Sequence, residues 1–389
     1  MRIVAIFLLS AIAGACGAGS TPVGGEPGTP LPDLPDTLLA KFFAGRALFD
    51  KVYTPEEGLG PMFNENQCSA CHTSPASGGT GGFERVVKAT RFGGPGDCDP
   101  LADFGGENIR TQATPRMKAL GFERESVPAA ATEVGHFLAP PLFGLGLVEA
   151  IPEEEIVLRE DPDDRDGDGI SGRAARTRDG RLARFGRKGE FATLREFVET
   201  ALRLEMGLTT RAEDVETFNG RPVPRTADPT PEPEVDSVTV DLLAAFVRFL
   251  APAAPLPPRS GPHRDTLEAG RRLFESIGCT SCHVPTMRTG RSPIPALDRK
   301  TVALYSDLLL HDMGPGLASV CAFDASPTEL RTPILAGLSS RSFYLHDGRA
   351  IDLRDAILAH GGEAQRARDA FARLPWLRQE YLIRFLKSL

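Results

Sequence analysis

Apolar residues recur at helical spacing in several stretches of this sequence. One such stripe consists of Leu194, Phe197, Val198, Ala201 and Leu202. Residues three and four positions apart lie on the same face of a helix, so this spacing predicts an amphipathic helix. Similar patterns at residues 243–250 and 380–386 predict two more helices. Because no segment shows a convincing alternation of apolar and polar residues, the sequence predicts a mainly α fold.

The first 16 residues have the pattern of an export signal. Arg2 supplies a short positive region, residues 3–12 are apolar, and residues 13–16 form a small-residue cleavage site. The apolar run is too short to span a bilayer, and no later run of about eighteen apolar residues follows it. Cleavage before Cys16 would give a lipidated N-terminal cysteine, although Ala13 stands where such signals usually carry leucine. We therefore expect a periplasmic or cell-surface protein, with an outer-membrane lipoprotein and a plainly secreted protein as alternatives.

Composition and charge limit the domain organisation and the partners. A chain of 389 residues, 41% of them hydrophobic, can form two cores. Its net charge of −8 argues against nucleic acid or an anionic membrane surface as a partner. Residues 17–36, rich in proline and glycine, are predicted to be a flexible tether. Residues 251–262 contain five prolines and are predicted to be a linker.

The strongest chemical signal is a C-x-x-C-H motif. It occurs twice, as Cys68, Cys71 and His72 and as Cys279, Cys282 and His283. In this motif two thiols attach to the vinyl groups of a c-type haem, and the histidine takes one axial position of the iron. The alternative is a zinc ion shared by both cysteine pairs, for which the usual spacing is roughly 15–20 residues. Since Cys71 and Cys279 are 208 positions apart (279 − 71), the sequence predicts two covalently bound c-type haems.

The two motifs lie within a longer internal repeat. The segment AGRALF at residues 44–49 precedes the first motif, and AGRRLF at residues 269–274 precedes the second. Three further matches follow in the same order: 141–145 with 333–338, 186–196 with 348–355, and 243–250 with 380–386. The repeat predicts two tandem cytochrome c-type haem domains with long loops, at residues 37–250 and 263–389.

Several second-half motifs resemble those of one known family. They are SDLLLHDMGP (306–315), RTPILAGL (331–338), YLHDGRA (344–350) and AILAHGGEA (356–364). Residues 40–389 resemble the di-haem oxidoreductase family, which is related to bacterial di-haem cytochrome c peroxidases and to a tryptophan-modifying di-haem enzyme. The resemblance implies two c-type haem domains packed on each other, often with calcium nearby, and electron transfer between the haems.

The repeat alignment distinguishes the two predicted haems, because His360 corresponds to Ala201. In the related peroxidases the position resembling His360 carries the distal ligand of the C-terminal haem. Such a six-coordinate haem would transfer electrons without binding substrate. Met313 is the competing ligand, and a solvated histidine at a helix end is the other interpretation of His360. His311 and His346 are more typical of donors to propionates or backbone than of ligands.

The first haem is then the predicted reaction site. Peroxide cleavage requires an acid–base group above the iron. In relatives the glutamate of a Glu-Met pair takes this role, and the resemblance places Glu205, followed by Met206, in the matching position with slightly tighter spacing. The alternative is that Glu205 is an exposed carboxylate at a helix end. His136 is a further candidate for a sixth ligand of this haem, although a lone histidine is more often structural.

An acidic loop is a candidate calcium site. Asp164, Asp166 and Asp168 alternate along the chain, with glycine after the last two. Carboxylates around a glycine turn suit a hard cation. The loop is not an EF-hand, because Ala175 stands where the bidentate glutamate would be. The alternative is an acidic loop that Arg165 and Arg173 neutralise.

Cys98 and Cys321 lie outside the haem motifs and the N-terminal signal. In an oxidising compartment such a pair usually forms a disulfide, which here would join the two halves of the chain. The sequence leaves open whether their Cα atoms approach within about 7 Å.

These features together predict a di-haem c-type oxidoreductase that reduces hydrogen peroxide at the first haem. Electrons would arrive through the second haem from a small donor protein, a cytochrome or a cupredoxin. One alternative is an electron-transfer di-haem cytochrome without catalysis, and another is peroxide- or dioxygen-dependent oxidation of an organic or protein substrate. A close copy of the tryptophan-modifying mechanism is disfavoured, because the only tryptophan, Trp376, lies near the C-terminus.

Overall fold

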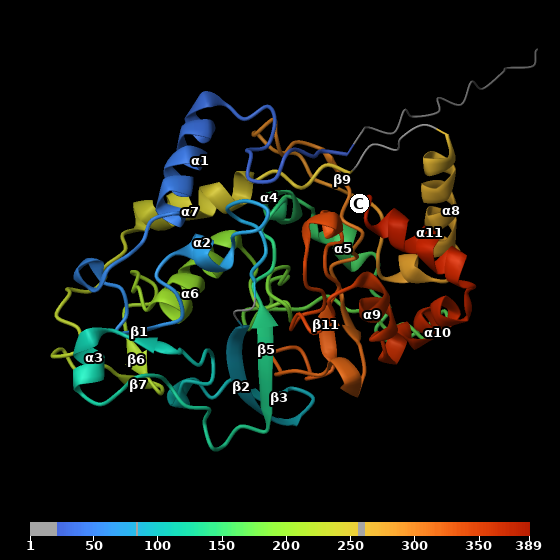
Figure 1. Cartoon of the computed structure of the whole chain (residues 1–389). Helices are drawn as coiled ribbons and strands as arrows, with labels where there is room; N and C mark the ends of the chain where they lie inside the picture. The colour runs from blue at the N-terminus through green and yellow to red at the C-terminus, as the bar shows by residue number, and fades with distance from the viewer. Residues whose placement is uncertain (1–21, 83–84, 256–260) are drawn as a thin grey trace, which may run out of the picture.

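The computed structural model describes residues 22–82, 85–255 and 261–389 (Figure 1). The predicted export signal at residues 1–16, including Cys16, lies outside the described residues. So do residues 17–21 of the predicted tether and residues 256–260 of the predicted linker. Within the described ranges, no helix combines the length and the apolar character needed to cross a membrane.

The fold combines helices with small antiparallel sheets, at 33% helix and 14% strand. The helices are α1 (Asp36–Phe49), α2 (Cys68–Cys71), α3 (Pro115–Ala119), α4 (Leu145–Glu149), α5 (Glu153–Val157), α6 (Leu194–Met206), α7 (Ser237–Phe249), α8 (Pro262–Ser276), α9 (Leu353–Leu358), α10 (Gln365–Arg373) and α11 (Trp376–Leu386). The strands are β1 (Met62–Phe63), β2 (Arg85–Gly94), β3 (Asp97–Asp99), β4 (Gln112–Ala113), β5 (Glu133–Leu138), β6 (Thr217–Phe218), β7 (Arg221–Pro222), β8 (Met287–Arg288), β9 (Thr301–Val302), β10 (Leu310–Asp312) and β11 (Glu329–Arg331).

The prediction of a mainly α fold is therefore wrong, and the cause lies in the strands. The largest sheet has the order β3-β2-β5, and β2 pairs with β5 so that Thr90 faces Glu133. These partners are far apart in the sequence, so no local pattern reveals that they pair. Most of the other strands are only two or three residues long, which is too short for alternation to be recognised.

The helices predicted from apolar spacing are confirmed. The stripe that starts at Leu194 forms α6, and the two later runs form parts of α7 and α11. Helix α6 begins with a capping box, in which the Thr193 hydroxyl accepts from the amide of Glu196 and the Glu196 carboxylate accepts from the amide of Thr193. It ends at Gly207, whose φ of 68° suits a residue without a Cβ atom.

Each half of the chain contains the same helix pairing. Helix α1 packs against α7 at one end of the molecule, and α8 packs against α11 at the other (Figure 1). A Cβ atom at Gly45 would lie 2.0 Å from the carbonyl oxygen of Leu242, and one at Gly270 would lie 2.1 Å from that of Tyr381. Both glycines belong to the repeated Ala-Gly-Arg segment. The sequence repeat therefore corresponds to a repeated helix crossing, in which glycine allows two backbones to approach closely.

Among the described residues, the hydrophobic core consists of one large cluster, a smaller one and two minor ones. The smaller cluster joins Phe274, Phe371 and Phe385 within the second half. The larger cluster is built around Phe42 and Phe246, and it also includes residues between Met287 and Leu309. These later residues belong to the second repeat in sequence, so the two halves share packed surface.

The described part of the predicted tether, residues 22–36, is not a free segment. Leu31 is only 2% exposed and belongs to the larger core cluster. Its amide donates to the carbonyl of Phe249, and the amide of Gly25 donates to the carbonyl of Pro252. This segment is ordered, because its amides pair with the rest of the protein. A composition rich in proline and glycine is equally compatible with a flexible tether, so the sequence alone could not separate the two.

Candidate functional site

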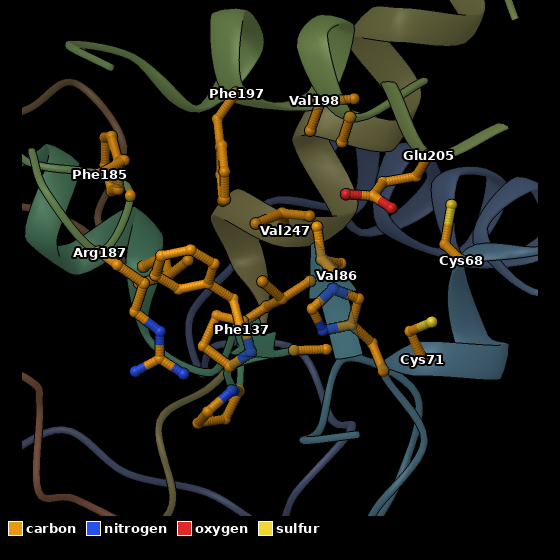
Figure 2. A pocket seen from close by; sticks show the side chains of 18 of the residues that line it. Cys68, Cys71, Val86, Phe137, Phe185, Arg187, Phe197, Val198, Glu205 and Val247 are labelled. Carbon is orange, nitrogen blue, oxygen red and sulfur yellow. The ribbon is translucent and has the colours of Figure 1, made fainter. Parts of the chain in front are cut away.

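The first C-x-x-C-H motif opens into a cavity of about 280 Å³. Cys68, Cys71 and His72 line part of it, and residues of α6 line another part. Figure 2 shows the sulfur atoms and the Glu205 carboxylate around the same space, with Phe137 and other apolar side chains completing the wall. The apolar stripe of α6 therefore faces this cavity, because Phe197, Val198 and Ala201 line it.

The ring of His72 is held in one orientation. Its Nδ1 lies 3.2 Å from the carbonyl oxygen of Gly79, so Nδ1 carries the proton and Nε2 remains available to a metal. Burial lowers the pKa of His72, which keeps the imidazole neutral. Phe49 packs beside the ring at 6.1 Å between centroids.

Glu205 occupies the last turn of α6 and faces this cavity. Its Oε2 accepts a hydrogen bond of 2.8 Å from Nδ2 of Asn64. Burial raises the pKa of Glu205 even though Asn64 and Asn108 stabilise the ionised form. Glu205 is therefore half-buried in the cavity wall, which differs from the alternative interpretation as an exposed helix-end charge.

The second motif opens into an adjoining cavity of about 360 Å³. Nδ1 of His283 lies 2.8 Å from the carbonyl oxygen of Tyr305, and burial lowers the pKa of His283 to about 4. Phe274 packs beside this ring at 6.3 Å, as Phe49 does beside His72. The second site thus repeats the first, with a neutral imidazole whose Nε2 remains available.

His360 and Met313 both line the second cavity. Nδ1 of His360 lies 2.8 Å from the carbonyl oxygen of Ala356, and burial lowers the pKa of this histidine. A neutral ring that is fixed through Nδ1 is typical of a metal ligand and less typical of a solvated histidine at a helix end. Its counterpart in the repeat, Ala201, lines the first cavity. Both ligand candidates are therefore within reach of the second cavity, and the choice between them stays a prediction.

His311 belongs to a buried polar cluster at the edge of the second cavity. Its ring lies 2.9 Å from a carboxylate oxygen of Asp307, 2.7 Å from one of Glu363 and 3.7 Å from the Cys282 sulfur. Burial alone would lower the pKa of His311, but the hydrogen bonds to these partners raise it to about 12. His311 therefore contacts Cys282, Asp307 and Glu363, and three of these four residues, Cys282, Asp307 and His311, also lie close enough together to hold a metal ion. Its predicted role as a donor rather than a ligand stays a prediction.

The two cavities share a wall. Its members are Leu138, Pro141, Arg187, Arg331, Pro333 and Arg341. Burial lowers the pKa of each of the three arginines to about 10. The Nε atoms of Arg187 and Arg341 have no hydrogen-bond partner. Sequence reasoning missed these arginines, although Arg187 and Arg331 stand in segments that the repeat and the family resemblance had singled out.

The three aspartate carboxylates of the acidic loop lie close together. Ligand atoms of Asp164, Asp166 and Asp168 lie within 4.8 Å of one another. Neither neighbouring arginine neutralises them, because Arg165 pairs with Asp163 and Arg173 pairs with Asp324 and Glu329. The loop contributes Asp168 to the lining of the second cavity. Whether it binds calcium stays a prediction.

Of the other sequence candidates, His136 and Trp376 fall outside both cavities and His346 lines the second. His136 is exposed on the face of β5 opposite to the cavity-lining Phe137, because neighbouring strand residues point to opposite sides. Trp376 is 68% exposed on α11. His346 lines the second cavity with its Nδ1 unpaired, which suits the predicted role of a donor.

Cys98 and Cys321 form a disulfide with a Cα separation of 5.9 Å. It connects β3 of the first half to a loop of the second half. The four cysteines of the C-x-x-C-H motifs are not disulfide-bonded.

Two adjoining apolar cavities, each with a cysteine pair and a neutral, oriented histidine, define a haem-binding redox protein. The chain belongs to the family described as "Di-haem oxidoreductase, putative peroxidase", whose model matches residues 129–389. It is therefore an oxidoreductase with haem cofactors. The match includes the second C-x-x-C-H motif, and the first lies before its start.

Similar solved structures share little sequence with this chain. The diheme peroxidase BthA of Burkholderia thailandensis is 15% identical, with a TM-score of 0.43 over 92% of this chain and 86% of that protein. A hydrazine synthase of Kuenenia stuttgartiensis is 14% identical, with a TM-score of 0.42 over 100% of both chains. A MauG-like protein associated with microbial copper homeostasis is 16% identical, with a TM-score of 0.31 over 61% of this chain and 89% of that one. No curated protein sequence matches this chain.

The residues of both cavities fit haem. Each cavity offers paired thiols and an available imidazole Nε2 to an iron porphyrin. The unpaired Nε atoms of Arg187 and Arg341 lie in the wall common to both cavities. Buried guanidinium donors of this kind are the groups that carboxylates such as haem propionates require.

Proposed function

We propose that this oxidoreductase binds two covalently attached c-type haems and reduces hydrogen peroxide at the first cavity. The thioether bonds would form at Cys68 and Cys71 and at Cys279 and Cys282. The observation that carries the proposal is the contrast between the cavities. The first is lined by a half-buried carboxyl, that of Glu205, whereas the second is lined by His360 and Met313, which are both able to ligate iron.

Glu205 would serve as the proton carrier. Reduction of hydrogen peroxide to two water molecules consumes two electrons and two protons, and haem iron supplies the electron-transfer chemistry. Burial raises the pKa of Glu205 above its ordinary value, so the carboxyl exchanges a proton more readily at neutral pH. The hydrogen bond from Asn64 keeps the carboxyl directed along the cavity wall. Glu205 would move a proton from one peroxide oxygen to the other as the O–O bond breaks.

The second cavity would receive the electrons. His283 and His360 line it as neutral rings fixed through Nδ1, which favours a six-coordinate site without room for substrate. Arg187, Arg331 and Arg341 line the wall between the cavities. They would hold both cofactors in fixed relative positions, as electron transfer between them requires.

The proposal also includes an electron donor, a cellular location and a calcium site. A small cytochrome or cupredoxin would deliver the electrons in the periplasm or at the cell surface, where Cys16 could carry a lipid anchor. Calcium would bind at Asp164, Asp166 and Asp168, whose carboxylates lie together beside the second cavity. Nucleic acid is not an expected partner of a chain with a net charge of −8.

Peroxide turnover by the mature holoprotein tests the proposal. With a reduced small cytochrome as donor, we expect two electrons to be consumed per peroxide, and reduction of one haem to make the other high-spin and reactive. If both haems stay low-spin and inert to peroxide in every redox state, the protein is an electron carrier. If peroxide is consumed only when an organic compound is oxidised, the protein is an organic-substrate oxidase.

A further inference from the structure

A second group of acidic residues lies away from both cavities. Glu216, Asp228, Glu232 and Glu234 each place a carboxylate oxygen within 4.8 Å of the others. They belong to the segment that joins the end of α6 to the start of α7. We name this group the four-carboxylate cluster, and it differs from the exposed loop at residues 164–168 in its burial.

Three oxygens of the cluster are buried without a hydrogen-bond partner. They are Oε1 of Glu216, Oδ2 of Asp228 and Oε1 of Glu234. Among the buried, unsatisfied side-chain atoms of the described residues, these are the only carboxylate oxygens. Glu216 is only 8% exposed. Buried polar atoms almost always have partners, so three orphaned oxygens in one group indicate a missing ligand.

Three other oxygens of the cluster, on Asp228, Glu232 and Glu234, accept hydrogen bonds from the protein. One oxygen of Asp228 accepts from the amide of Thr230 at 2.8 Å, and one of Glu234 accepts from the amide of Thr209 at 2.8 Å. The Thr209 hydroxyl lies against both Glu232 and Glu234, but it has a single proton to donate. Backbone amides therefore orient Asp228 and Glu234 and leave one oxygen of each without a partner.

The negative charge of the cluster is not neutralised by an ion pair among the residues that the structure describes. Within the described part of the chain, no lysine, arginine or histidine forms an ion pair with any of the four carboxylates. Buried carboxylates at such spacing require either protons or a cation.

We propose that the four-carboxylate cluster binds a calcium ion. All of its donors are oxygen atoms, which hard cations prefer over the nitrogen and sulfur ligands of zinc or copper. Calcium accepts six to eight oxygens in flexible geometry, whereas magnesium requires a tight octahedron and keeps its waters. The ion would tie Thr209 and Glu216 to residues 228–234 and so fix the chain immediately after Glu205 and Met206.

Calcium titration of the holoprotein tests this site, with the exposed loop removed by Asp164→Asn and Asp168→Asn. In this background we expect calorimetry to detect one bound calcium and saturating calcium to raise Tm by about 3–5 °C. Magnesium at the same concentration should raise Tm less. Adding Glu216→Gln and Glu234→Gln should abolish both binding and the rise in Tm. In chelator, this variant should be at least as stable as its parent, because the repulsion is relieved.

A second variant keeps the test decisive if the buried replacements prevent folding. Glu232 is exposed, so Glu232→Gln should fold and weaken calcium binding at least tenfold. Unchanged affinity in that variant, or no calcium binding once the exposed loop is neutralised, would overturn the proposal. An equal response to magnesium would overturn the choice of calcium. Loss of binding only in the Asp164 and Asp168 variants would leave the exposed loop as the calcium site.

Discussion

At the scale of single residues, burial decides what Glu205 can do. The carboxyl lies in the wall of an apolar cavity and accepts one hydrogen bond from Asn64. A glutamate in water would be fully ionised near neutral pH, whereas this one has a raised pKa. Glutamate is usually a surface residue, but the surroundings of Glu205 make it a candidate acid–base group.

Replacing Glu205 by glutamine should slow peroxide turnover by about a hundredfold or more, the usual contribution of a positioned proton carrier. Glutamine keeps the size of the side chain and its hydrogen bond, so both resting haem spectra should remain nearly unchanged. Steady-state peroxide consumption measures the effect. Glu199→Gln, on the same helix but paired with Arg195, is the control and should retain activity. Full activity of Glu205→Gln would remove the catalytic assignment.

The raised pKa of Glu205 also predicts a pH dependence of stability. In the unfolded chain the carboxyl has the ordinary glutamate pKa of about 4.5, whereas in the folded protein burial raises this pKa. The unfolded state therefore loses its proton first, and the wild type should lose stability as pH rises from 4.5 through the folded pKa. Urea unfolding at a series of pH values should show a flatter profile for Glu205→Gln. Parallel profiles for the two proteins would contradict the shift.

His360→Ala should convert one low-spin haem to high-spin and increase its affinity for small ligands. It should also slow electron delivery to the first haem, since the axial ligand is a main determinant of haem potential. Absorption spectra and redox titration measure both effects. Met313→Ala is the matched variant, because Met313 lines the same cavity. If Met313→Ala changes the spin state and His360→Ala does not, the ligand is Met313.

At the scale of elements, the repeat is visible in how helices cross. Phe49 packs against Phe246 at 4.8 Å between α1 and α7, and Phe274 packs against Phe385 at 5.5 Å between α8 and α11. The same two phenylalanines, Phe49 and Phe274, lie beside the motif histidines. Each helix pair therefore positions one side of a cavity, and its geometry depends on the glycine at the crossing.

Gly45→Ala and Gly270→Ala should each destabilise the protein by about 1–3 kcal/mol, the usual cost of overpacking. The added Cβ would overlap a carbonyl oxygen of the partner helix, at 2.0 Å and 2.1 Å respectively. Urea unfolding measures the loss. Gly316→Ala is the control, because nothing lies within 4 Å of its added Cβ, and it should change stability by less than about 0.5 kcal/mol. Wild-type stability of both crossing variants would contradict this account of the repeat.

At the scale of the whole molecule, the two halves form one connected unit. The disulfide between Cys98 and Cys321 joins them. Lys188, which is 1% exposed, donates to the carbonyls of Ser326, Pro327 and Glu329 across the same interface. These contacts keep the two cavities adjacent with a common wall, which electron transfer between two cofactors requires.

The mature protein should carry two haems that remain attached after denaturation. Mass spectrometry of the denatured chain should show the mass of two haems, and Cys279→Ser with Cys282→Ser should lose one of them. Those residues lie only in the second cavity, so the spectrum of the remaining haem identifies the first site. A single haem in the wild type, or zinc in its place, would contradict the proposed cofactor content.

The sequence by itself determined the local features. The C-x-x-C-H spacing, the repeated Ala-Gly-Arg segment and the helical stripe from Leu194 depend on neighbours within a few turns of chain. Such patterns are visible without any tertiary contact. The family resemblance likewise rested on short contiguous motifs, and the match at residues 129–389 bears it out.

Only the tertiary structure decided the features that join distant residues. The β2–β5 pairing, the Cys98–Cys321 disulfide and the arginine wall between the cavities each connect segments remote in sequence. The burial of Glu205 and the four-carboxylate cluster belong to this group too. A side chain's pKa and ligands depend on what surrounds it in space, and residues 216 and 234 are adjacent only because the chain turns back between α6 and α7.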